Sequence, residues 1–167
     1  MKILNAFAAL LGLVALTGTV APAQAAEKAN WTATVNVNGD GTHVLGNPGA
    51  KVKVDEFISY TCEHCASFQI EAEAPMRLAY VQPGKVSVRI VHFVRDPVDL
   101  AVALAAHCGD PAGFFARHNM FLALQDKWMA KVRKTKESQR NRWTSGDMPS
   151  RMRAIASDID LYGMMAP

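Results

Sequence analysis

Two cysteines three positions apart, Cys62 and Cys65, lie where a strand pattern changes into a helix pattern, and this junction constrains the fold more than any other feature. Residues 51–58 alternate in polarity like a half-buried strand. From Cys65 onward, apolar residues recur at helical intervals, and residues 86–94 form a second strand pattern that is apolar on nearly both faces. The order strand, helix, strand predicts a βαβ unit with two parallel strands and a right-handed crossover.

The composition excludes several classes of protein. Half of the 167 residues are hydrophobic and 20% are charged, which excludes a disordered or collagen-like chain and indicates one globular domain. The formal net charge of +3 arises from 18 basic and 15 acidic residues. Because the two signs are so nearly balanced, the charge gives no indication of nucleic-acid binding.

The N-terminus has the features of a secretory signal peptide spanning residues 1–25. Lys2 precedes an apolar run over residues 3–20, and the small residues Ala23 and Ala25 suit a cleavage site before Ala26. The alternative is an N-terminal membrane anchor, because the run approaches the roughly 20 apolar residues of a spanning helix. Export places the cysteines where a disulfide can persist.

Further strand and helix patterns occur before, within and after the predicted βαβ unit. Residues 31–37 alternate as a further strand, and the apolar positions Cys65, Phe68, Ala72 and Met76 form a stripe along the helix, which Pro75 should kink without ending. The helix start signals are Asp96-Pro97 and Asp110-Pro111. We expect a helix over 98–108, a second running from 114 into the basic stretch 127–142, and a third after 147.

The pair of cysteines indicates redox chemistry. Cys62 is expected at the exposed helix N-terminus, where the helix dipole and an imidazolium at His64 would lower the pKa of its thiol, while Glu63 opposes them. Cys62 is therefore the predicted nucleophile and Cys65, one turn further in, the resolving thiol of a pair that alternates between dithiol and disulfide. Glu56 lies on the apolar face of its strand, so it is either at a wet strand end or a functional acid.

The segment 54–65, which ends in Cys62-Glu63-His64-Cys65, resembles the active-site strand and helix start of DsbA-like periplasmic thiol:disulfide oxidoreductases of the thioredoxin superfamily. This resemblance implies an α/β thioredoxin-like fold with a helical insertion, divided into residues 26–97 and 98–167. It also implies that Glu56 relays protons to and from Cys65. His64 matches the histidine of the oxidising members, whereas Glu63 replaces a common proline.

The same resemblance implies partners and location. The expected substrates are unfolded or reduced exported proteins in the periplasm, and a membrane redox partner would regenerate the disulfide. No proline follows a Thr or Val at the start of a later strand, where the superfamily has a cis-proline, and after residues 161–167 we expect the strand pair and closing helix of such a fold to be missing. We therefore expect a C-terminally truncated member that retains two or three strands.

Several alternatives remain. A disulfide reductase or isomerase is favoured if Glu63 outweighs His64, and a non-catalytic truncated binding module is possible without the cis-proline segment. No metal and no cofactor are predicted, because His107 with the two cysteines matches no zinc spacing. His92 and His118 are expected in structural positions. Cys108 is either a small buried hydrophobe or a third redox thiol.

Overall fold

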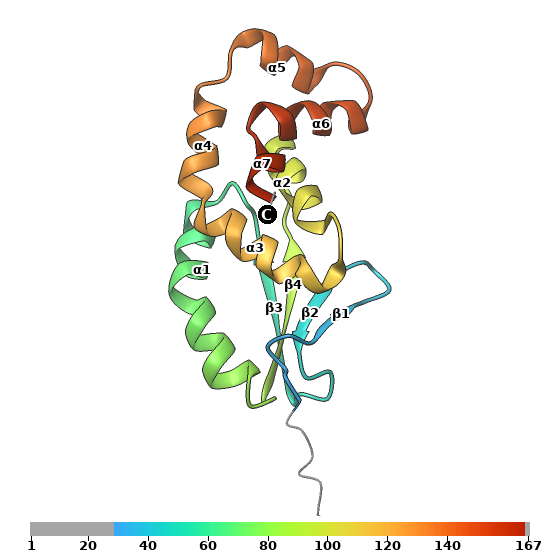
Figure 1. The fold of residues 1–167 in the computed structure, drawn as a ribbon, viewed down its shortest axis with the longest axis vertical. Helices are drawn as coiled ribbons and strands as arrows, with labels where there is room; N and C mark the ends of the chain where they lie inside the picture. Colours follow the sequence, from blue (N-terminus) through green and yellow to red (C-terminus); the bar gives the residue numbers. More distant parts are fainter. Residues whose placement is uncertain (1–28, 166–167) are drawn as a thin grey trace, which may run out of the picture.

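The computed structural model describes residues 29–165, so the predicted signal peptide lies outside the described residues. A four-stranded sheet forms the lower half of the molecule in Figure 1, in the order β1-β2-β4-β3. The strands are β1 (Val35–Val37), β2 (His43–Gly46), β3 (Val52–Ile58) and β4 (Val86–His92). β3 therefore lies at one edge of the sheet, beside β4 alone.

The predicted parallel pair is confirmed. β3 and β4 run parallel over their whole length, with Val54 opposite Val88 and Ile58 opposite His92. Glu56 shares a face with the apolar residues of β3, whereas Phe57 on the other face is 66% exposed. The alternation in the sequence thus distinguished the two faces of this strand correctly.

The first strand is shorter than predicted, and one strand was missed. Residues 31–33 form a turn instead of a strand, because Asn30 accepts hydrogen bonds from the hydroxyls of Thr32 (2.7 Å) and Thr34 (2.9 Å). These local side-chain bonds compete with strand pairing. β2, which carries no clear alternation, pairs antiparallel with both β1 and β4. The sheet has four strands where two or three were expected.

The helix that begins within the cysteine motif is α1 (Glu63–Met76). It continues as a π-helical segment, η1 (Arg77–Val81). Pro75 lies inside α1 without ending it, as predicted, and the wider π turn follows at once. The predicted apolar stripe along this helix is only partly buried, since Phe68 is 52% exposed. α1 packs mainly on α3 (Phe114–Ala123), which leaves a cavity between α1 and the strands.

The second half of the chain is helical. Its other elements are α2 (Pro97–His107), η2 (Pro111–Gly113), α4 (Gln125–Arg133), α5 (Glu137–Thr144), α6 (Met148–Asp158) and α7 (Leu161–Met165). The Asp96 carboxylate caps α2, as its start signal predicted, and the Asp147 carboxylate caps α6.

The helix predicted to run from residue 114 into the basic stretch is interrupted at Leu124, and the basic stretch itself is divided between α4 and α5. The buried Trp128 donates its indole N–H to the Phe121 carbonyl (2.8 Å), which folds α4 back on α3. The helices cover the carboxyl ends of β3 and β4, where the cysteine motif lies (Figure 1). Within residues 29–165, no helix is both long and apolar enough to cross a membrane. The division of the chain at residue 97 stays a prediction.

Candidate active site

Cys62 is the N-cap residue of α1, and Cys65 lies one turn further along the same helix. Both thiols are free and half-buried. The loop 59–61 connects β3 to this helix, and the Cys62 N–H donates to the Ser59 carbonyl (3.2 Å). The Cys62 side chain is therefore held beside the unpaired N–H groups that begin the helix.

The two thiols have opposite environments. The pKa of Cys62 is lowered, chiefly by the backbone N–H of Cys65 and further by the Cys65 thiol, the His64 N–H and the charge of Arg95. These are loose contacts, since the Cys62 side chain makes no regular capping hydrogen bond. The pKa of Cys65 is raised, chiefly by burial. A thiolate is thus favoured at Cys62 and disfavoured at Cys65.

His64 and Glu63 are both exposed on the first turn of α1. The backbone N–H of His64 contributes to the lowered pKa of Cys62, whereas the tuning role of its imidazole stays a prediction. His64 lines a cleft of about 280 Å³ in front of Cys62, together with Arg95 and Gln125.

Sequence reasoning missed Asp99, which organises the active-site loop. Its buried carboxylate accepts hydrogen bonds from the Ser59 hydroxyl (2.5 Å), the Tyr60 N–H (2.8 Å) and the Arg95 N–H (3.0 Å). The only sequence signal was its place as an acidic residue in the first turn of α2. Acidic residues are generally favoured there by the helix dipole, so this position by itself does not indicate a contact with the loop.

Gln125 was also missed. This buried side chain at the start of α4 donates to the carbonyls of Tyr60 (2.6 Å) and Cys62 (2.9 Å). A residue more than 60 positions away thereby holds the backbone on both sides of Thr61. Nothing in the local sequence marks Gln125 for this contact.

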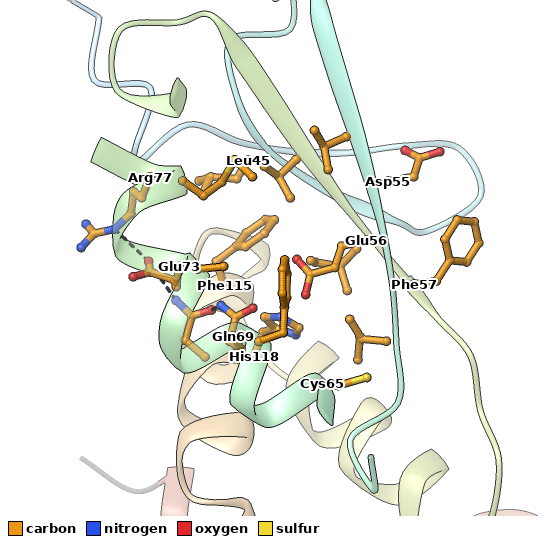
Figure 2. A pocket seen from close by; sticks show the side chains of 18 of the residues that line it. Leu45, Asp55, Glu56, Phe57, Cys65, Gln69, Glu73, Arg77, Phe115 and His118 are labelled. Atoms are coloured by element: carbon orange, nitrogen blue, oxygen red, sulfur yellow. Dashed lines mark hydrogen bonds and ion pairs between the residues drawn. The ribbon is translucent and has the colours of Figure 1, made fainter. Parts of the chain in front are cut away.

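Glu56 and Cys65 line the same cavity of about 400 Å³ between α1 and the strands. Figure 2 shows Glu56 directed into this space, whereas Asp55 and Phe57 point away from it. The Oε1 atom of Glu56 is buried and has no hydrogen-bond partner in the described part of the chain. Burial raises the pKa of Glu56, and its partly buried position with one buried, unpartnered oxygen favours the functional-acid alternative over a wet strand end.

The remaining histidines gather between the sheet and the helices. The fully buried His118 pairs with the Tyr60 hydroxyl through Nδ1 (2.9 Å), and His92 pairs with His107 through their Nε2 atoms (2.9 Å). Desolvation, with the charges of neighbouring histidines, lowers the pKa of His92 to about 4 and that of His118 to about 3. Both lie in the interior between the sheet and the helices, and the absence of a catalytic role stays a prediction.

Residues 29–165 contain no cluster of three or more His, Cys, Asp or Glu side chains suited to a metal ion. His107 contacts His43 and His92. Cys108 is exposed, so its assignment as a small buried hydrophobe is wrong. The reason is that α2 ends at His107, and the helical face that would have buried Cys108 ends with it.

Fold and site together define a thioredoxin-like protein with a helical insertion and a redox-type cysteine pair. A family model described as thioredoxin matches residues 38–160, and the chain belongs to this family. The fold expected from the sequence is confirmed.

The crystal structure of a protein-disulfide isomerase from Novosphingobium aromaticivorans is similar to this chain. The two are 46% identical with a TM-score of 0.69, over 75% of this chain and 64% of that one. A Rickettsia bellii protein named as a protein-disulfide oxidoreductase is 34% identical over 86 residues, which are 51% of this chain and 33% of the relative. The chain thus spans a third of one relative and just under two thirds of the other.

A Wolbachia pipientis α-DsbA1 structure shares the fold. It is 21% identical with a TM-score of 0.51, and the match covers 78% of this chain and 74% of that one.

Proposed function

We propose that this chain is a DsbA-type thiol:disulfide oxidoreductase that forms disulfides in exported proteins. One observation carries the proposal: two free thiols lie one turn apart at the start of α1, Cys62 as the N-cap residue in the cleft and Cys65 lining the cavity that also holds Glu56, and their pKa values are shifted in opposite directions. This asymmetry suits an exposed attacking sulfur and a buried resolving sulfur. The names of the Novosphingobium and Rickettsia relatives support the same class of reaction.

The proposed reaction starts from the Cys62–Cys65 disulfide. A substrate thiolate attacks the Cys62 sulfur, so a substrate–Cys62 bond forms and the Cys62–Cys65 bond breaks. Cys65 leaves as a thiolate and takes up one proton. A second substrate thiolate then attacks the substrate sulfur of the mixed disulfide, and Cys62 leaves as a thiolate. The substrate loses two electrons and the enzyme gains them.

Each predicted residue has a role in this scheme. Cys62 is a good leaving group because the helix N-terminus stabilises its thiolate, which favours an oxidising enzyme. Glu56 would supply the proton that Cys65 takes up, since both line one cavity and burial keeps this carboxyl group protonated to a higher pH. An imidazolium at His64 would add to the stabilisation of the Cys62 thiolate.

The proposed partners follow from the reaction. The substrates are unfolded or reduced exported proteins, and the electrons gained must pass to a membrane redox partner that restores the disulfide. Export to the periplasm depends on the predicted signal peptide over residues 1–25. The resemblance to DsbA-type proteins supports both assignments.

A reductase or isomerase is the second candidate, because the similar Novosphingobium structure carries the name of a protein-disulfide isomerase. The direction of the reaction depends on the reduction potential. A value near about −120 mV indicates a strong oxidant, and one near about −270 mV a reductant.

A glutathione redox titration of the chain from Ala26 to Pro167 tests the proposal. Trapped thiols are assigned by peptide mass to Cys62, Cys65 and Cys108, with Cys108→Ala as the control that removes mispairing. We expect Cys62 and Cys65 to change together, at a potential well above that of thioredoxin. Thiols that titrate independently, with no turnover of reduced client above the glutathione background, would leave a non-catalytic binding module.

A further inference from the structure

Arg95 lies in the connection between β4 and α2, and its guanidinium is held against the active-site loop. Nε donates to the Ser59 hydroxyl (2.9 Å) and Nη2 donates to the Thr61 hydroxyl (3.1 Å). An exposed arginine is ordinarily a mobile charge with several rotatable bonds. Here two hydrogen bonds fix the position of the charge.

The two hydroxyls are themselves fixed by carboxylates of α2. Ser59 donates to Asp99 (2.5 Å), and Thr61 donates to Asp96 (2.8 Å). Because each hydroxyl gives its proton to a carboxylate, its lone pairs are left to accept from Arg95. The start of α2 thus determines where the cation lies.

This cation lines the cleft in front of Cys62. The other charged groups of the cleft are Glu63, Asp126 and Arg133, with His64 as a titratable neighbour. Arg133 makes no hydrogen bond to the loop within the described residues, so the cleft offers one fixed cation and one unfixed cation for comparison.

We propose that Arg95 is a positioning residue that holds a fixed positive charge beside the Cys62 sulfur and thereby raises the reactivity of this thiol at neutral pH. The charge of Arg95 acts in the same direction on both cysteines, lowering the pKa of each. The effect of Arg95 on the reactivity of Cys62 is independent of the proposed function. Only the use of that reactivity in forming disulfides rests on the proposed function. A more stable Cys62 thiolate makes the protein a stronger oxidant.

Alkylation of the reduced full chain by iodoacetamide tests this, with modification of Cys62 followed by peptide mass from pH 5 to 10. In Arg95→Gln, the rate at neutral pH should fall about threefold, while the plateau at high pH stays the same, because only the thiolate reacts. The difference should shrink in 1 M salt, since Arg95 is exposed and screened. Arg95→Lys should lose less than Arg95→Gln, because it keeps the charge and gives up the paired hydrogen bonds.

Two further variants separate position from charge. Thr61→Val removes one of the two hydroxyls and should shift the pH profile in the same direction as Arg95→Gln. Arg133→Gln removes the unfixed cation of the same cleft and should change the rate by less than about 1.5-fold. An unshifted pH profile in Arg95→Gln, or an equal shift in Arg133→Gln, would overturn the proposal. Alkylation does not require disulfide exchange, so a chain that shows the shift but oxidises no substrate contradicts the proposed function alone.

Discussion

The active-site loop has two sides with opposite chemistry. On the side of α2, the loop is held by Asp99 and Arg95, whose polar atoms are joined by several hydrogen bonds. On the cavity side, Glu56 has a buried oxygen with no partner among residues 29–165, and the wall is largely apolar. Cys62 lines the polar cleft and Cys65 lines the cavity.

The two sides give the two thiols of one helical turn opposite pKa shifts. The polar side provides N–H groups and a cation, both of which stabilise a thiolate. On the cavity side, partial burial is the main influence on Cys65 and Glu56, and it favours a neutral thiol and a neutral carboxyl group. The difference in reactivity arises from the surroundings of each sulfur, and the predictions below alter one side at a time.

The largest effect is expected from acid acting on the buried histidines next to the cavity. His92 and His118 are held neutral in the folded state, with pKa values of about 4 and about 3. Unfolding restores an ordinary pKa near 6.5, so below that pH the unfolded chain binds more protons and the fold loses stability as the pH falls. Each histidine contributes about 1.4 kcal/mol per pH unit, or about 4 kcal/mol for the pair between pH 7 and pH 5.

Urea unfolding at pH 7, 6 and 5 measures this loss. The variant His118→Gln should flatten the slope, whereas His64→Gln, at an exposed position, should retain it. A free energy of unfolding that stays constant from pH 7 to pH 5 would contradict the assignment of neutral buried histidines.

Replacing Asp99 should disrupt the hydrogen-bond network on the α2 side of the active-site loop. Asp99→Ala leaves the Ser59 hydroxyl and two backbone N–H groups without their buried acceptor, which is expected to cost about 3 kcal/mol in the free energy of unfolding. The matched control is Asp110→Ala, an exposed cap of η2 that accepts one N–H, for which about 1 kcal/mol or less is expected. Equal losses in urea titrations of the two variants would show that the network adds nothing beyond an ordinary cap.

Glu56→Gln should change the free energy of unfolding in the opposite direction to Asp99→Ala. Burial raises the pKa of Glu56 in the folded state, so its favourable contribution is present below the ordinary pKa and is lost as the pH rises through the folded value. At pH 7 the substitution removes a buried charge and should increase the free energy of unfolding by about 1 kcal/mol, with no gain at pH 4. It should also slow proton uptake by Cys65 during disulfide exchange.

The control is Asp55→Asn on the exposed face of the same strand, which loses its ion pair with Arg89 and should not be stabilised. Stopped-flow exchange and urea unfolding of both variants give the two readouts. A Glu56→Gln protein that is less stable at pH 7 would contradict the conclusion that the Glu56 carboxyl group is buried without a hydrogen-bond partner.

The smallest effect is expected at His64. Its imidazole is exposed, and solvent screens its charge, so His64→Ala should lower the alkylation rate of Cys62 at pH 6 by only about twofold. A tenfold loss would mean that the imidazole, and not the helix N-terminus, dominates the reactivity of Cys62.

The sequence alone determined the features that depend on near neighbours. The alternation over 51–58, the helix after Cys62, the cap at Asp96 and the helical pattern after residue 147 are confirmed, because side-chain periodicity and capping involve residues within one or two turns. The break at Leu124 was missed, since it depends on the packing of Trp128 against α3.

Tertiary structure alone decided what surrounds each sulfur. The contacts of Asp99 and Arg95 with the loop join residues about 35 to 40 positions apart, and those of Gln125 join residues more than 60 apart. No periodicity or spacing encodes such a contact, because it exists only after β4 has paired with β3 and placed the start of α2 beside Ser59. The motif identified the two thiols, and the folded chain gave them surroundings that shift their pKa values in opposite directions.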